Sequence, residues 1–237
     1  MSIDSTENVA LITGSNRGIG LEVTQQLARR GFHVVIAARN EASGRKAASD
    51  IVRDGGRATF LPLDVSNSDS IENAAAQFGS VAGHLNGLIN NAGIYPDEGV
   101  SVLTLSRGQL KETFDTNTFG PLEVTQAFLP YLRRADSARV INVSSGYGQL
   151  DGMSPDVPSY CLSKHALNGL TIMLVDALRA DDISVNALCP GWVRTDMEGS
   201  NATLSVEEGA DTAIWLAQEA PHELTGKLFR ERQEVNW

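Results

Sequence analysis

The feature of this sequence that most constrains its fold is the alternation of short apolar runs with longer stretches of helical periodicity. Short runs rich in Val, Ile and Leu are typical of strands buried on both faces, and the stretches between them are typical of the helices that cover such strands. Parallel strands are then joined by right-handed crossovers. The sequence therefore predicts an α/β fold, a doubly wound domain with a mostly parallel sheet and helices on both faces.

The positions of these elements follow from the same pattern. The predicted strands lie at Val9–Ile12, His33–Ala38, Ala58–Leu63, Leu85–Ile89, Val140–Val143, Ile183–Leu188 and Lys227–Phe229. The predicted helices lie at Leu21–Ala28, Glu41–Arg53, Ser68–Val81, Tyr160–Ala180 and Val206–Gln218. Ser205 with Glu208 three residues later is typical of a capping box. We find no linker or repeat, so we expect a single domain over residues 1–237, with its ligand beyond the carboxyl ends of the strands.

Composition narrows the class of protein. The chain has 237 residues, 42% of them hydrophobic, and a formal net charge of −10. An acidic chain poor in aromatic residues is not expected to bind nucleic acid. No run reaches the length of a membrane span, and the polar N-terminus does not resemble a signal peptide. Two cysteines, Cys161 and Cys189, make no disulfide framework, so we expect a cytoplasmic protein.

A glycine-rich turn follows the first predicted strand. Gly14, Gly18 and Gly20 allow a tight turn and a close approach of the backbone to a phosphate group, and the following helix directs its N-terminus at that group. An ordinary strand–helix turn is the alternative, but the strand before and the helix after favour the phosphate site. The candidate cofactor-binding residues of this turn are Gly14, Asn16, Arg17, Gly18, Ile19 and Gly20.

The end of the second predicted strand indicates which dinucleotide is bound. A fold that binds NAD usually places a carboxylate there for the ribose hydroxyl. This chain has Arg39 instead, and Arg17 lies in the glycine turn. Guanidinium groups grip phosphate in a bidentate manner. The pair favours NADP(H) over NAD(H), the alternative being that each arginine is a solvated surface charge.

Tyr160 and Lys164 are four residues apart on the longest predicted helix. Residues at this spacing share a helix face, so the phenol and the ammonium group can enter one site. A tyrosine, whose pKa is ordinarily about 10, is a useful acid–base group near neutral pH when a nearby cation stabilises its phenolate. Of the four tyrosines, only Tyr160 has a lysine at this spacing.

Taken in order along nearly the whole chain, these motifs resemble the short-chain dehydrogenase/reductase family. The glycine spacing, the Asn90–Gly93 run, the strand ending in Ser144 and Ser145, and the Tyr160–Lys164 pair carry the resemblance. Residues 189–197 and the terminal Trp237 are most similar to the NADPH-dependent carbonyl reductase branch. The resemblance implies a Rossmann-type domain, with a cofactor half over about 1–145 and a catalytic and substrate half over about 145–237, that reduces a ketone or aldehyde by hydride transfer.

The resemblance also implies roles for individual residues. Tyr160 would give a proton to the substrate oxygen, Ser145 rather than Ser144 would hold that oxygen, and Lys164 would lower the pKa of Tyr160. Asn117 would position a water molecule that connects Lys164 to solvent. Further implied cofactor contacts, besides Tyr160 and Lys164, are Asp64, Val65, Asn91, Ala92, Gly93, Pro190, Gly191, Val193 and Thr195. The expected substrate residues are Ser145, Ile94, Tyr147, Met153 and Trp192, and no metal site is expected, because the histidines lack ligand-spaced partners.

Two alternatives to this function stay open. The first is an alcohol or polyol dehydrogenase that works with NAD(P) in the oxidative direction. The second is a redox sensor that binds NADP without catalysis, although such proteins typically lack the tyrosine or the lysine.

The absence of an insertion before Tyr160 predicts that copies of this chain associate. Monomeric animal carbonyl reductases of this family carry a long insertion before the tyrosine, whereas here 14 residues separate Ser145 from Tyr160. Two apolar rows run along the predicted helix, one containing Leu162 and Met173 and the other Leu167 and Leu174. One row can face the sheet, so we expect the other to form a homodimer or homotetramer contact, unless a loop over Pro96–Leu105 covers it.

Overall fold

Eight strands form one sheet in the order β3-β2-β1-β4-β5-β6-β7-β8 in the computed structural model, which describes residues 7–197, 199 and 201–237. Neighbouring strands are parallel except for the last pair, β7 and β8. The strands are β1 Val9–Thr13, β2 His33–Ala38, β3 Arg57–Pro62, β4 Gly87–Asn90, β5 Arg139–Val143, β6 Ser184–Leu188, β7 Leu228–Arg230 and β8 Gln233–Val235. The predicted mostly parallel sheet is confirmed.

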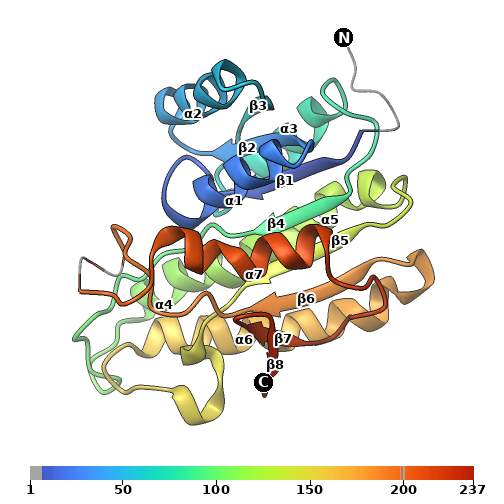
Figure 1. The fold of residues 1–237 in the computed structure, drawn as a ribbon. Coiled ribbons are helices and arrows are strands. Elements are labelled where there is room, and N and C mark those ends of the chain that lie inside the picture. Colours follow the sequence, from blue (N-terminus) through green and yellow to red (C-terminus); the bar gives the residue numbers. More distant parts are fainter. Residues whose placement is uncertain (1–6, 198, 200) are drawn as a thin grey trace.

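Helices cover both faces of this sheet (Figure 1). One face carries α1 (Gly18–Arg29), α2 (Glu41–Arg53) and α7 (Val206–Gln218). The other face carries α3 (Ser68–Phe78), α5 (Gly120–Leu132) and α6 (Pro158–Leu178). The short helix α4 (Arg107–Phe114) packs against α6 and continues into α5 through one π-helical turn, η1 (Asp115–Phe119). The doubly wound fold is confirmed.

Each face of the sheet has its own apolar core. Alternate residues of one strand pack into one core and then into the other. On β1, Val9 and Leu11 pack toward α3 and α5, whereas Ala10 and Ile12 pack toward α1 and α7. All four side chains are fully buried. Double burial explains why the strands read as continuous apolar runs rather than alternating ones.

The structure adds helices that the sequence pattern did not predict. The predicted elements left residues 94–139 unassigned, yet α4, η1 and α5 fill much of this stretch. Helix α5 contains Pro121 in its first turn and Pro130 near its end, and these prolines obscure the helical signal. Helix α6 begins at Pro158, two residues before its predicted start, because proline is well suited to the first helical position.

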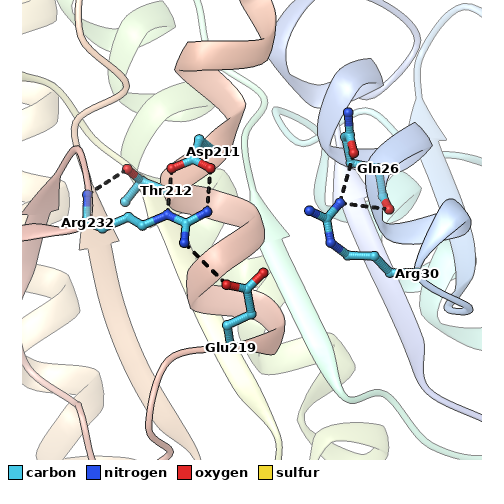
Figure 2. A network of polar contacts seen from close by, with 6 residues as sticks. All are labelled: Gln26, Arg30, Asp211, Thr212, Glu219 and Arg232. Carbon is cyan, nitrogen blue, oxygen red and sulfur yellow. Dashed lines mark hydrogen bonds and ion pairs between the residues drawn. The ribbon is translucent and has the colours of Figure 1, made fainter.

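The carboxyl-terminal hairpin is fastened to α7 by a group of polar contacts (Figure 2). Arg232, in the turn between β7 and β8, bonds both oxygens of Asp211 at 2.7 and 2.5 Å and reaches Glu219 at 3.2 Å. Its backbone N–H donates to Thr212 Oγ1.

The capping box of Ser205 and Glu208 at the start of α7 is confirmed. Within the described residues, no helix is long and apolar enough to cross a membrane.

Strand order reverses between β1 and β4, which lie side by side although two further strands separate them in the sequence. At such a point the loops that follow the two strands diverge and leave a crevice at the carboxyl edge of the sheet. Among the described residues there are also three short 3-10 turns: η2 (Gly146–Gly148), η3 (Leu150–Gly152) and η4 (Arg179–Asp181). Turns η2 and η3 follow β5 and therefore lie at the edge where the crevice opens.

Candidate active site

A cavity of about 640 Å³ occupies the crevice at the carboxyl edge of the sheet. Its walls come from the segments that follow β1, β4, β5 and β6, and from the first two turns of α6. The residues that line it are Gly14, Arg17, Gly18, Ile19, Gly20, Asn91, Ala92, Gly93, Ile94, Tyr95, Pro96, Glu112, Val143, Ser144, Ser145, Tyr160, Lys164, Pro190, Gly191, Val193, Thr195, Asp196 and Met197. The structure thus brings most of the predicted site residues together.

The glycine turn forms one end of this cavity. Gly14 has φ +64°, and a Cβ atom there would lie 2.9 Å from the Cα of Ala92. A Cβ atom on Gly20 would lie 2.5 Å from Asn91 Nδ2, which donates to the carbonyl of Thr13 at 2.9 Å. Glycine is required at both places, because the turn after β1 is packed against the turn after β4. The N-terminus of α1 opens into the space that remains, as an anion site needs.

Tyr160 and Lys164 lie on one face of α6 and both line the cavity. The Nζ atom of Lys164 is 5.6 Å from the centre of the Tyr160 ring and donates to the carbonyl of Val143 at 2.8 Å. The side chain is buried, 4% exposed. Burial lowers the pKa of Lys164 to about 8, although Cys189 acts in the opposite direction. The lysine is therefore still mostly an ammonium group at neutral pH, placed beside the phenol ring.

The two serines after β5 have different surroundings. The Ser144 hydroxyl is buried and donates to Asn168 Oδ1 at 2.5 Å. Ser145 is half-buried, and its Oγ accepts the backbone N–H of Tyr147 at 3.2 Å. An Oγ that accepts this bond still has its proton to donate into the cavity. This arrangement supports Ser145, rather than Ser144, as the hydroxyl available to a substrate.

Asn117 lies in the π-helical turn η1 and is fully buried. Its side chain bonds both the N–H and the C=O of Ile94, at 2.8 and 2.9 Å, and donates to Ser163 Oγ at 3.1 Å. A Cβ atom on Gly93 would lie 3.3 Å from Asn117 Oδ1 and 3.6 Å from Lys164 Nζ. Asn117 is therefore placed behind the cavity wall, next to the lysine, in the kind of π-helical turn that often marks functional sites.

Four predicted cofactor residues are not among those that line the cavity. Asn16 Nδ2 donates to Ser43 Oγ at 3.0 Å, and Arg39 is exposed at the end of β2. Asp64 accepts from the N–H and hydroxyl of Ser66, while the Val65 side chain packs into the core next to α3 and α5. Asn16 lies in the glycine turn after β1, Arg39 follows β2, and Asp64 and Val65 follow β3.

Arg17 lines the cavity at its outer edge and is already paired. Its Nη1 atom lies 2.9 Å from Asp196 Oδ2, and both side chains are mostly exposed. The pair joins the glycine turn to the segment that follows β6, across the mouth of the cavity. The sequence showed both charges but gave no signal of this contact, because 179 positions separate the two residues.

The expected substrate residues divide into two groups. Ile94 and Ser145 line the cavity. Tyr147 does not line it, although its ring lies edge-on to the Tyr160 ring with centroids 6.3 Å apart. Met153 and Trp192 are not in the lining, and Trp192 is 48% exposed.

Sequence reasoning missed other wall residues. Tyr95 lies 4.7 Å from Tyr160, ring centre to ring centre, and Pro96, Glu112 and Met197 also line the cavity. These residues stand in irregular segments or in the unpredicted helix α4, so no motif marks them. Among the residues that the structure describes, no group of three His, Cys, Asp or Glu side chains is placed to hold a metal ion.

A dinucleotide-type crevice with a tyrosine and a lysine at its centre defines an oxidoreductase of the short-chain class, and comparison with known proteins agrees. The family model described as short chain dehydrogenase matches residues 8–204, and the chain belongs to this family. The sequence is 31% identical to (+)-neomenthol dehydrogenase of Arabidopsis thaliana, covering 98% of this chain and 99% of the relative. It is 32% identical to carbonyl reductase (NADPH) 3 of Rattus norvegicus, covering 99% and 100%.

A solved structure shows the same relationship. The NADPH-bound carbonyl reductase from chicken fatty liver superposes with a TM-score of 0.86 at 29% identity, over 98% of this chain and 99% of that chain. The alignment with the rat protein runs over 282 positions, more than the 237 residues of this chain, so that relative has segments that this chain lacks.

Proposed function

We propose that this protein reduces a ketone or aldehyde to an alcohol with NADPH, with Tyr160 as the proton donor. The observation that carries the proposal is the placement of Tyr160, Lys164 and Ser145 around one cavity whose other end is the glycine turn. Near-full-length similarity to NADPH carbonyl reductases supports the choice of substrate class and cofactor. Two buried cysteines without a disulfide suit a cytoplasmic setting.

The residues present fit NADP(H). The close packing at Gly14 and Gly20 leaves backbone rather than side chains facing the pyrophosphate, and the N-terminus of α1 faces the same group. Arg39, exposed at the end of β2, and Arg17, at the mouth of the cavity, would contact the 2′-phosphate. When bound, the cofactor supplies the hydride that reduces the carbonyl carbon.

Each side chain of the site has a separate task in this proposal. Tyr160 gives its phenolic proton to the carbonyl oxygen, and Ser145 donates a hydrogen bond to the same oxygen. Lys164 stabilises the phenolate that remains, because a cation close to a phenol favours its charged form. Asn117 holds the backbone of Ile94 and fixes the wall of the cavity beside Lys164.

Oxidation of an alcohol is the second candidate. One relative is named as a dehydrogenase of a cyclic terpene alcohol, neomenthol. The same residues serve this direction, with the Tyr160 phenolate taking the hydroxyl proton and the cofactor accepting the hydride. Ile94, Tyr95, Pro96 and Met197 give part of the wall an apolar or aromatic surface that suits a cyclic alcohol.

The test is a steady-state assay in both directions. NADPH oxidation is followed with quinones, α-diketones, aldehydes and cyclic ketones, and NADP+ reduction with cyclic terpene alcohols and polyols. The proposal expects turnover of at least one carbonyl class with NADPH, and a higher kcat/KM for reduction than for oxidation. Turnover of alcohols alone would favour the second candidate. Tight binding of NADPH without turnover in either direction would indicate a sensor instead.

A further inference from the structure

The helix that carries Tyr160 does not cap its own N-terminus. The N-cap residue of α6 is Val157, whose side chain has no oxygen to accept a hydrogen bond. Pro158 follows and has no N–H group. The first N–H groups that need an acceptor are therefore those of Ser159 and Tyr160, at the second and third helical positions.

Asp97 supplies the missing cap from a distant part of the chain. Its Oδ2 atom accepts the N–H of Ser159 at 2.5 Å and the N–H of Tyr160 at 3.3 Å. Asp97 is fully buried and belongs to the segment between β4 and α4. One carboxylate oxygen therefore holds the backbone of Tyr160 directly.

The other oxygen of Asp97 makes this cap costly. Oδ1 is buried and has no hydrogen-bond partner among the atoms that the structure describes. A buried carboxylate oxygen without a partner lowers the free energy of unfolding. An unsatisfied buried polar group calls for an explanation, and a role at a functional site is one.

The segment that contains Asp97 also touches the Tyr160 side chain. The Tyr95 ring lies edge-on to the Tyr160 ring, with centroids 4.7 Å apart. From α4, Thr113 Oγ1 lies 2.9 Å from Ser159 Oγ. The first turn of α6 is thus held by backbone, hydroxyl and ring contacts.

We propose that Asp97 is a positioning residue for the proton transfer: it caps α6 from outside, fixes Tyr160 relative to Lys164, and offsets the positive end of the helix at the phenol. The inference rests on the proposed function, because it assumes that Tyr160 is the proton donor. An aspartate at a helix N-terminus counters the helix dipole, and side chains of the first turn point back toward that end.

The charges around Tyr160 determine whether removing the Asp97 charge makes the phenol lose its proton at lower or at higher pH. On α6, Lys164 favours the phenolate, and the neighbouring Cys161 is a thiol whose pKa is raised by burial, with a smaller contribution from Asp97. Tyr95 faces the ring from the segment after β4, and Asp97 of the same segment bonds the Tyr160 backbone. Tyr147 faces the ring from η2, and Glu112 of α4 lines the same cavity. Removing the Asp97 charge removes an anion that opposes the phenolate, so the phenol should lose its proton at lower pH.

Two substitutions separate the cap from the charge. Asp97→Asn keeps an oxygen acceptor but removes the negative charge. Asp97→Ala removes both. Asn67→Ala is the matched control, because Asn67 caps α3 by accepting the N–H of Ser70 at 2.9 Å, on a helix that does not carry the tyrosine. Each variant is assayed for kcat, for the dissociation constant of NADPH and for the pH dependence of carbonyl reduction.

We expect Asp97→Asn to keep kcat at neutral pH within about threefold, while the alkaline loss of activity moves at least about half a pH unit lower. Asp97→Ala should lower kcat at least about tenfold, with the dissociation constant of NADPH unchanged. The control Asn67→Ala should lower thermal stability without changing either the turnover or the pH profile.

Wild-type kcat and pH profiles in both Asp97 variants would overturn the inference. If Asp97→Ala does not fold, the pH profile of Asp97→Asn decides alone, and an unmoved alkaline limb contradicts the role. A Tyr160→Phe variant measured alongside tests the proposed function separately. Full activity in that variant would reject Tyr160 as donor, whereas an inactive Tyr160→Phe with unaffected Asp97 variants would reject the role of Asp97 only.

Discussion

At the scale of single residues, the charge of Lys164 lowers the free energy of unfolding because it is buried. Its ammonium group is buried, with the carbonyl of Val143 as a hydrogen-bond partner, and its pKa falls to about 8. In the unfolded chain a lysine has a pKa near 10.4. Below pH 8 the folded protein must keep this charge buried. The contribution of Lys164 to stability is therefore lowest below pH 8 and rises as pH increases from about 8 toward 10.5.

Lys164→Met should remove this pH dependence. The unfolded state binds more protons at this residue than the folded state between about pH 8 and 10.5, so the wild-type protein gains stability there. From pH 7 to 9.5 the gain should be about 2 kcal/mol relative to the variant. Urea unfolding of both proteins at the two pH values measures it. Parallel pH dependence of the two proteins would contradict burial of a charged Lys164.

Arg39→Asp should change the choice of cofactor. The substitution replaces a guanidinium group, which we place at the 2′-phosphate, with an anion that repels phosphate and can accept the ribose hydroxyl. A lost charge-assisted hydrogen bond is worth about 1.5–3 kcal/mol. The ratio of kcat/KM for NADPH over NADH should therefore fall by about one to two orders of magnitude.

Arg30→Asp is the control for net charge. Arg30 follows the last residue of α1, at the end remote from the glycine turn, and contacts Gln26 (Figure 2). Its substitution should leave the cofactor ratio unchanged. If the ratio of kcat/KM for NADPH over NADH is the same in wild type and Arg39→Asp, Arg39 does not bind the 2′-phosphate.

At the scale of helices and strands, the sequence predicts most of the elements that build the cavity. The runs at Val9–Ile12 and Val140–Val143 are buried on both faces, so their periodicity and length are clear. The glycine turn and the Tyr160–Lys164 spacing are local patterns, and the structure places both at one cavity.

Long-range contacts explain what the sequence does not predict. Asp97 acts on residues 62 and 63 positions away, in an irregular segment that has no periodicity. Arg17 and Asp196 meet across the cavity mouth because the folded chain brings the glycine turn beside the segment that follows β6. The sequence indicates the need for Asp97 only indirectly. A helix whose N-cap residue is Val157 and whose first residue is Pro158 needs a hydrogen-bond acceptor from another part of the chain.

The hairpin of β7 and β8 depends on Arg232. Its bidentate contact with Asp211 and its contact with Glu219 tie the turn to α7, but the side chains are about two-fifths exposed. Solvent screening limits such pairs, so Arg232→Ala should cost about 1 kcal/mol or less in urea unfolding. Arg179→Ala, which removes an i,i+3 pair with the mostly exposed Asp176, should cost less. A larger loss in the Arg179 variant would contradict the role of Arg232.

At the scale of the whole molecule, α6 packs one apolar row against the sheet and leaves part of the other row exposed. Leu167, Leu174 and Leu178 are buried, whereas Leu162 and Met173 are 40% and 70% exposed, and Ile172 is 45% exposed. An apolar row exposed in this way is typical of an interface. We propose that two copies of the chain associate through this face in a two-fold symmetric homodimer or homotetramer.

Met173→Glu should disrupt this association. A charge at the centre of an apolar interface is costly to bury, so the dissociation constant between copies should rise by at least about a hundredfold. Light scattering at micromolar concentration measures the mass. Val52→Glu, on the exposed side of α2, is the control and should stay oligomeric. Wild-type protein with the 25.4 kDa mass of one chain would refute the assembly.

The most direct test of the proposed chemistry is Tyr160→Phe, with Tyr131→Phe as its matched control. The first substitution removes the phenolic proton and keeps the ring, and the second removes only a hydrogen bond to the carbonyl of Ala75, away from the cavity. Carbonyl-dependent NADPH oxidation should fall at least about a hundredfold in Tyr160→Phe, with NADPH affinity largely kept, and should be normal in Tyr131→Phe. Near-normal turnover in Tyr160→Phe would contradict its assignment as the proton donor.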